Sequence, residues 1–238
     1  MTTKRSPPAW TLDGHRARRD GVTVDLTRPR AGLALAATGD SVLGLELRPE
    51  AADAVEPRDR WLRGDDLVAV YEPEDQRQLR ATAMWRGLGG PSPVWEVVVS
   101  SQTSLLESDC RIAVVSDVGV GDVAWGRRSQ GSDILWTVWE PGLDREASHR
   151  CPEEAECLFV RRDRDAVLLA VHPADRRRIE IAVHGDRLEI LCWLFSEASE
   201  KGVLFRSRVR AAIGPATRRD WAEQIVRALA AEPPPLDT

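Results

Sequence analysis

The feature that most constrains this chain is a nearly unbroken series of short strand-like segments, followed by one helix near the C-terminus. Apolar and polar residues alternate in the first of these segments, where Val22, Val24 and Leu26 share one face. A period of two is typical of a strand with one buried and one solvated face. Because the connections between segments are short, antiparallel neighbours are favoured. The pattern predicts an all-β protein.

Further strands are predicted along the first two thirds of the chain, separated by residues that favour turns. They span residues 33–37, 42–47, 66–71, 79–85, 94–101, 110–116 and 134–139. Residues 49–60 and 142–155 are polar and predict loops. The most glycine-rich connector is 119–131, and its Gly119-Val120-Gly121 lacks the third glycine and the following helix of a dinucleotide-binding loop. We interpret it as a turn.

The last third of the chain carries the strongest strand signal. Residues 157–160 and 167–172 are apolar on both faces, as expected of central strands. Residues 177–184 and 188–195 alternate on either side of a His-Gly-Asp turn. The cleanest alternation covers residues 203–213.

One amphipathic helix is predicted over residues 218–231. Its apolar stripe recurs at helical spacing and consists of Trp221, Ile225, Val226 and Leu229. Thr217 is the expected N-cap, and the prolines that begin at Pro233 end the helix. We expect this helix to lie across a sheet edge or opening.

The fold class expected from these elements is a large two-layer antiparallel β-sandwich with one C-terminal α-helix. Residues 1–14 are expected to form an N-terminal tail or edge segment, and residues 15–238 a single domain. This architecture is similar to the galactose-mutarotase-like super-sandwich. The segments 171–175 (VHPAD), 200–203 (EKGV) and 208–210 (RVR) also resemble uncharacterised bacterial β-sandwich proteins, over roughly the last third of the chain. That resemblance implies a fold and transfers no functional residue.

Composition and charge narrow the classes of function. The net charge of −5 gives no reason to expect a nucleic-acid partner. The charged N-terminus is not followed by an apolar run, and no stretch approaches the roughly 20 apolar residues of a membrane helix. We therefore expect a cytoplasmic protein with no membrane partner. Phosphate-binding loops, zinc-protease motifs and nucleophile elbows are absent from the sequence, so no cofactor is expected.

The cysteines give little reason to expect a metal. His149, Cys151 and Cys157 are near in sequence, but they lack the paired short spacings of known zinc sites. Cys110 and Cys192 lie in apolar strand patterns and are interpreted as small buried residues. No metal site is expected.

Candidate catalytic residues are His172, His184 and Glu180 in the late strands. A sugar epimerase needs an acid and a base on either side of the sugar ring, typically histidine and carboxylate. The residue types fit, but the sequence does not fix their mutual geometry. The simpler interpretation of His172, which precedes Pro173 at a strand end, is an ordinary hydrogen-bonded histidine.

The most concrete ligand candidate is the arginine row, which we define as Arg206, Arg208 and Arg210 on one face of a strand. The strand rise places successive guanidinium groups about 6.6–7 Å apart. One interpretation is a solvated outer face with ion pairs, in which Glu180 supplies a carboxylate. The other is a concave site for an anion or an acidic sugar. The alternation of faces along the strand further predicts that the arginines keep their charged ends in solvent or ion pairs. It predicts that the residues of the opposite face are buried, namely Val203, Phe205, Val209 and Ile213.

Four tryptophans lie in predicted strands: Trp95, Trp136, Trp139 and Trp193. Large aromatics in strands are mostly core residues, although Trp193 is a candidate for stacking on a sugar. Taken together, the sequence favours a non-catalytic cytoplasmic β-sandwich that binds a sugar, a small anion or a partner on one sheet face. The alternative is a carbohydrate-active enzyme of the aldose-epimerase type, and a third reading is a structural, self-associating protein. The oligomeric state stays open.

Overall fold

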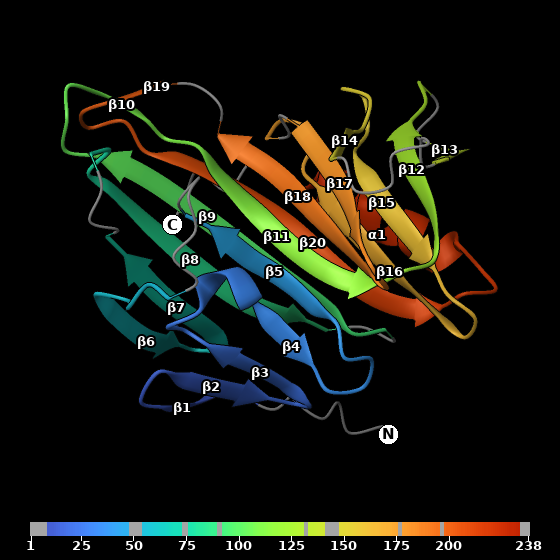
Figure 1. The fold of residues 1–238 in the computed structure, drawn as a ribbon, viewed down its shortest axis with the longest axis horizontal. Coiled ribbons are helices and arrows are strands. Elements are labelled where there is room, and N and C mark those ends of the chain that lie inside the picture. Colours follow the sequence, from blue (N-terminus) through green and yellow to red (C-terminus); the bar gives the residue numbers. More distant parts are fainter. Residues whose placement is uncertain are drawn as a thin grey trace.

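The computed structural model describes residues 9–47, 54–72, 76–89, 92–130, 133–140, 148–175, 178–195 and 198–233. Two nine-stranded sheets, called sheet A and sheet B, form the two layers of the molecule (Figure 1). The strand pairings in this part of the chain are all antiparallel. The predicted all-β sandwich with a single C-terminal helix is confirmed.

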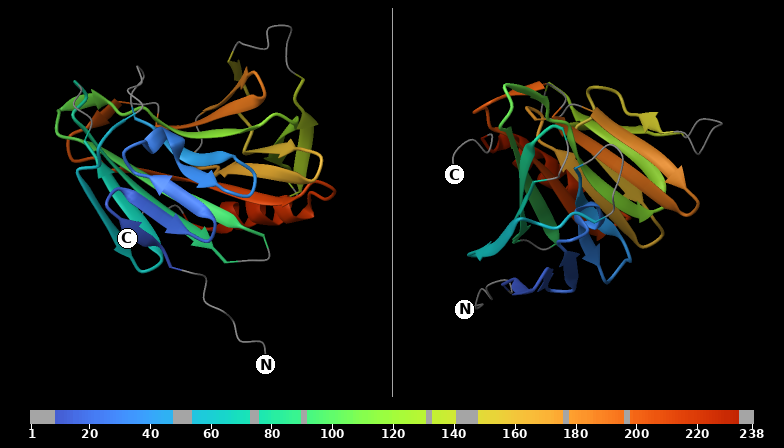
Figure 2. Two further views of the ribbon diagram at one scale, coloured as in Figure 1. Left: turned by 60° about the horizontal axis from the view of Figure 1, so that its bottom comes forward. Right: turned by 60° about the vertical axis from the view of Figure 1, so that its left-hand side comes forward.

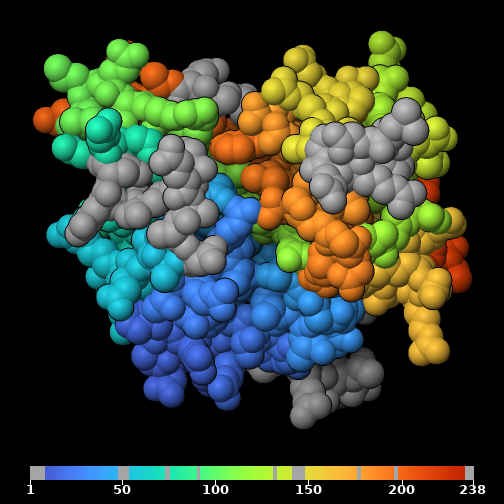
Figure 3. All heavy atoms as spheres, in the orientation of Figure 1, coloured from blue at the N-terminus to red at the C-terminus, as the bar shows by residue number. Residues whose placement is uncertain are grey.

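Sheet A gathers the early strands at one side and late strands at the other. In spatial order it contains β1 (Thr11–Asp13), β2 (Arg16–Arg19), β3 (Val22–Asp25), β4 (Leu33–Leu35), β5 (Ser41–Glu46), β11 (Ile112–Gly119), β18 (Arg187–Phe195), β17 (Arg178–His184) and β14 (His149–Arg150). A 3₁₀ helix, η1 (Pro29–Ala31), precedes β4. The space-filling view shows the early strands in blue below the β17–β18 hairpin in orange (Figure 3).

Sheet B is built around the last strand of the chain. In spatial order it contains β13 (Ile134–Val138), β12 (Asp122–Arg128), β15 (Cys157–Arg161), β16 (Asp165–Val171), β20 (Phe205–Pro215), β9 (Val94–Thr103), β8 (Leu79–Leu88), β7 (Asp66–Tyr71) and β6 (Asp59–Arg63). A separate two-stranded ribbon pairs β10 (Glu107–Asp109) with β19 (Ala198–Glu200). The helix α1 (Asp220–Ala231) follows β20.

The main core lies between the sheets, and two aromatic side chains of sheet B form hydrogen bonds to β5 and to the residue that follows β3. Trp85 and Tyr71 are fully buried in this core. Trp85 Nε1 donates a hydrogen bond to the carbonyl of Leu43 (2.9 Å), and Tyr71 Oη donates to the carbonyl of Leu26 (3.0 Å). Because buried polar groups need partners, these bonds fix how the two layers are aligned.

A second core lies between α1 and the outer face of sheet B (Figure 2). Ala222, Val226 and Leu229 of the helix are buried against Phe159 and other outward-facing residues of the sheet. The helix begins two residues later than predicted, and Arg219 is the N-cap in place of Thr217, with no side-chain cap hydrogen bond. The expected apolar stripe is therefore real, whereas the expected capping interaction is not formed.

Replacing Gly214 with Ala is expected to lower the free energy of unfolding by about 1–3 kcal/mol, because overpacking forces neighbours to shift. A Cβ atom at this position would lie 2.4 Å from the Trp221 ring, which packs directly on the strand backbone. Urea denaturation measures the change. A Cβ at Gly89 meets no atom within 4 Å, so Gly89→Ala is the matched control and should be nearly neutral. Equal stability of the two variants would contradict the close helix contact.

Several elements differ from the sequence prediction. The predicted connector 119–131 contains strand β12, and the predicted loops 49–60 and 142–155 contain the start of β6 and the short strand β14. Residues 48–53 and 141–147 lie outside the described residues. Gly126 explains the error in β12. A Cβ there would lie 2.7 Å from Cys157 Sγ and 2.9 Å from Trp136, so this glycine marks close packing within a strand and not a turn.

The parity prediction for β20 holds at its centre and weakens at its ends. Val209 is buried, Phe205 and Ile213 are half-buried, and Val203 precedes the strand and is 39% exposed. The even positions do face outward, but Arg208 and Arg210 are only 4% exposed and are in ion pairs. The outer face of this strand is therefore covered. In the described part of the chain, no helix is long and apolar enough to cross a membrane.

Candidate functional site

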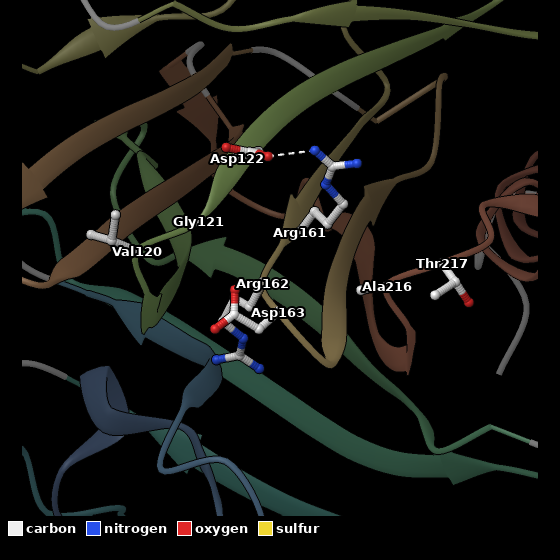
Figure 4. A pocket seen from close by; sticks show the side chains of 8 residues that line it. All are labelled: Val120, Gly121, Asp122, Arg161, Arg162, Asp163, Ala216 and Thr217. Carbon is white, nitrogen blue, oxygen red and sulfur yellow. Dashed lines mark hydrogen bonds and ion pairs between the residues drawn. The ribbon is translucent and has the colours of Figure 1, made fainter.

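Two adjoining cavities, of about 670 and 460 Å³, open at one end of the sandwich. Both are lined by Val120, Gly121, Asp122 and Arg161, so we describe them as one site, the end pocket. These residues come from the β11–β12 turn and from the end of β15 (Figure 4). A Cβ atom at Gly121 would lie 2.3 Å from the carbonyl oxygen of Arg161, so glycine is required where the two segments meet.

The larger cavity lies over the ends of sheet B strands. Arg162 and Asp163 contribute from the β15–β16 hairpin, and Ala216 and Thr217 from the connection between β20 and α1 (Figure 4). This part of the end pocket is mostly polar in its side chains. It suits a hydrated or charged group.

The smaller cavity has an apolar wall from both layers. Val123, Val138 and Trp139 contribute from the sheet B side, and Val183 and Leu188 from sheet A. The Trp139 ring meets the His149 ring edge to face, with centroids 5.7 Å apart. An apolar wall beside a polar rim is the usual composition of a small-molecule site.

Both signs of charge line the end pocket, from Arg161, Arg162 and Arg219 on one side and Asp122 and Asp163 on the other. Arg161 pairs with Asp122 (2.5 Å), a carboxylate whose side chain is 72% exposed. The Arg219 guanidinium lies over the rings of Trp136 and Phe159, 5.3 and 5.2 Å from their centroids. Within the described ranges, no carboxylate lies at ion-pair distance from Arg219.

The pKa of Arg219 reflects this setting. Burial lowers it, the positive charge of Arg161 lowers it further, and the carboxylate of Glu223 offsets only part of the effect. A guanidinium that is partly desolvated and repelled by a neighbour is stabilised by an added negative charge. A negative charge placed next to Arg219 would therefore relieve the repulsion from Arg161.

Arg162 has a different role, because it joins the two sheets. Its Nη1 donates to the buried carboxylate of Asp40 (2.8 Å) and its Nε to Asp165 (2.7 Å). Asp40 also accepts a hydrogen bond from the Gly119 N–H (3.0 Å). Burial opposes the charge of Arg162, but the bonds to Asp165 and Asp40 outweigh it and raise its pKa. These carboxylates hold Nε and Nη1 of Arg162, whereas its buried Nη2 has no hydrogen-bond partner among the described residues.

The predicted catalytic residues do not share a site. His172 follows β16 on the outer face of sheet B, where its Nε2 lies 3.1 Å from the carbonyl oxygen of Glu232. Ala174 N–H donates to its Nδ1 (3.2 Å). Glu180 and His184 lie on β17 with their side chains opposite to the core residue Ile181, on the outer face of sheet A. The two histidines thus lie on opposite outer faces and do not form one acid–base pair.

Two of the predicted residues are brought together, in a small cluster on the outer face of sheet A. Trp193 Nε1 donates to Glu180 (2.9 Å), and Arg178 pairs with the same carboxylate (2.8 Å). The Arg178 guanidinium also covers the Trp193 ring, 4.8 Å from its centroid. The expectation that Glu180 pairs with the arginine row is therefore corrected, because Glu180 lies in the other sheet.

The arginine row lies on the outer face of sheet B, near the end of α1. Arg206 Nε donates to Ser100 Oγ (3.1 Å). Arg208 and Arg210 pair with Glu232, and Arg210 pairs also with Glu96. The arginine row is thus neither a fully solvated sheet face nor an open concave site, because the Glu232 carboxylate lies against it.

The four cysteines are all buried. Cys151 faces the core between the sheets and Cys157 faces the core under the helix, so they do not meet. Burial raises the pKa of the Cys151 thiol to about 12, which keeps it protonated. No group of three metal-ligating side chains occurs among the residues that the structure describes.

The sequence prediction missed the end pocket. Its charged residues lie at the ends of elements that are far apart in the chain: Asp122 begins β12, Arg161 ends β15 and Arg219 precedes α1. The available signals were two arginine pairs, Arg161-Arg162 and Arg218-Arg219, each next to a turn. No protein-family model matches the chain, and no curated protein is significantly similar to it.

Proposed function

We propose that the protein binds a small amphipathic anion in the end pocket and acts as a binding protein. One observation carries the proposal: Arg219 presents a partly desolvated guanidinium, unpaired with any described carboxylate, beside Arg161. Like charges this close repel each other, and a bound anion relieves the repulsion. Arginine also binds carboxylates and phosphates with two parallel hydrogen bonds.

The apolar wall defines the rest of the ligand. A flat apolar or sugar face would pack against Trp139, while Val183 and Leu188 close the cavity from sheet A. A sugar acid, a sugar phosphate or an aromatic carboxylate has this combination of an apolar face and one anionic group. The proposal retains the sugar or small anionic ligand expected from the sequence, and with it a cytoplasmic location and a fold like the galactose-mutarotase-like super-sandwich. It moves the ligand from a sheet face to the end of the sandwich.

A thermal-shift screen of sugar acids, sugar phosphates and aromatic carboxylates tests the proposal, because a ligand that binds the folded state raises its melting temperature. Arg219→Gln is expected to weaken the dissociation constant of the best ligand about tenfold or more, as expected for loss of a charge-assisted hydrogen bond. Titration calorimetry measures the change.

Arg218→Gln is the matched control. Arg218 is the preceding residue, is exposed and pairs with Asp220, but does not line the end pocket. The control should bind like the parent protein. The proposal is wrong if no anion raises the melting temperature, or if the Arg219→Gln variant binds the ligand as tightly as the control does.

A further inference from the structure

The arginine row is anchored within sheet B by a network of charges. Arg210 lies opposite Glu96 on β9, and Glu96 lies opposite Arg86 on β8. Arg210 Nε donates to one oxygen of Glu96 (2.7 Å), and Arg86 Nε donates to the other (2.8 Å). One fully buried carboxylate thus serves two guanidinium groups. Among the described residues, Arg208 has no ion pair with a carboxylate of a sheet strand, although Asp175, which follows β16, attracts its charge.

Residues that follow the helix complete the network, and we call Glu232 and Pro233 the C-terminal segment. The Glu232 carboxylate accepts hydrogen bonds from Arg208 Nη1 (2.8 Å) and Arg210 Nη2 (2.6 Å). The carbonyl oxygens of Glu232 and Pro233 accept from Arg208 Nη2 (3.2 and 2.8 Å). The Glu232 carbonyl also lies 3.1 Å from His172 Nε2. Side chains of the sheet therefore contact one carboxylate and two consecutive peptide carbonyls.

The two sides of this contact differ in burial. Arg208 and Arg210 are 4% exposed, whereas the Glu232 side chain is 41% exposed. In the described part of the chain, Arg208 Nε is a buried donor without a hydrogen-bond partner. The arginines are thus fixed in the sheet, while the carboxylate approaches from solvent and leaves one donor unused. Such a contact is easier to exchange than one buried on both sides.

We propose that Arg208, Arg210 and His172 form a receptor for an acidic peptide segment, and that the C-terminal segment occupies this receptor in the free protein. The ligand is an extended peptide with a glutamate whose own carbonyl and the next carbonyl are free to accept hydrogen bonds. Proline after the glutamate suits this mode of binding, because it has no N–H and favours an extended chain. The receptor is distinct from the end pocket, since the 12 residues of α1 span about 18 Å between them.

Competition within the chain sets the expected affinities. A tethered segment acts at an effective concentration on the order of millimolar. If the free receptor binds a peptide with a dissociation constant of about 100 μM, the tethered segment weakens the observed binding roughly tenfold. Removal of the Glu232 carboxylate should therefore strengthen the observed peptide binding by most of this tenfold factor.

Fluorescence anisotropy with a labelled hexapeptide, acetyl-Ala-Ala-Glu-Pro-Pro-Pro-amide, tests the proposal on the full-length chain. The peptide matches residues 230–235. Glu232→Ala is expected to bind it about tenfold more tightly than the parent protein. Glu153→Ala is the matched control, because it removes one exposed carboxylate at another place, and it should bind like the parent.

Two further measurements decide the outcome. A peptide with Gln in place of Glu should bind the Glu232→Ala protein at least tenfold more weakly, and this test needs no arginine variant to fold. Arg208→Gln in the Glu232→Ala background should lose peptide binding while keeping the β circular dichroism spectrum. Equal peptide affinity of the parent and Glu232→Ala proteins would overturn the proposal. Binding of inorganic phosphate but not of the peptide would also overturn it, in favour of a simple anion site.

Discussion

The Glu96→Ala variant is expected to lose about 3–5 kcal/mol of unfolding free energy, the typical cost of leaving a buried charge without its partner. The Glu96 side chain is 0% exposed and is shared by Arg86 and Arg210. Without it, Arg210 remains buried with Glu232 as its one ion-pair partner among the described residues. Urea denaturation followed by circular dichroism measures the loss.

Asp122→Ala provides the comparison for this variant. It also removes a carboxylate from an arginine ion pair, but that pair is exposed. Exposed pairs contribute about 0–1 kcal/mol, so the control should change stability by less than 1 kcal/mol. If the two variants lose similar amounts of unfolding free energy, burial does not explain how much the Glu96 ion pairs stabilise the protein.

Asp40→Ala is expected to cost a similar amount, about 3–5 kcal/mol, for a related reason. Asp40 is fully buried in the turn before β5, and it receives Arg162 from the β15–β16 hairpin of the other sheet. Its loss leaves the Arg162 charge half-compensated by Asp165 and frees the Gly119 N–H. The ends of the two sheets then lose a direct link beside the end pocket. Urea denaturation is again the measurement.

A double-mutant cycle separates the ion pair from other effects of the Asp40 change. Arg162→Met removes the charge and keeps an apolar side chain at the hairpin. The double variant should be clearly more stable than the sum of the single losses predicts, because neither charge is left unpaired. Additive losses would show that Asp40 and Arg162 do not stabilise each other.

The sequence was sufficient to predict the fold class because most strands carry a clear alternation. The segment around Val209 is a good example, since arginines alternate with uncharged residues from Phe205 to Ala211. β12 was missed because Gly121 and Gly126 have the composition of a turn. Each of these glycines is required by contact with a neighbouring strand, and such a contact is not visible in local sequence.

The candidate sites were harder to predict, for a physical reason that the arginine row illustrates. Alternation along β20 correctly assigns Arg208 and Arg210 to the outward face. It contains no information about what covers that face, and Glu232 lies beyond a whole helix. The end pocket was missed for the same reason, because Arg161 and Arg219 are far apart in the chain and only the order of strands in the sheet brings them to one rim. Local periodicity predicts which face of a strand a residue occupies. A site also depends on which distant segments of the chain lie side by side in the fold.

The position of β20 has a consequence for synthesis of the protein. The last strand to be made is the central strand of sheet B, between β16 and β9. Until Phe205–Pro215 has left the ribosome, sheet B exists as two halves, each with an unpaired edge. The edge of β9 stays open while the chain grows from Thr103 to Phe205, for roughly 5–20 s at common rates of translation. Open edges pair readily with other chains, so we expect the risk of aggregation during synthesis to be highest in that interval.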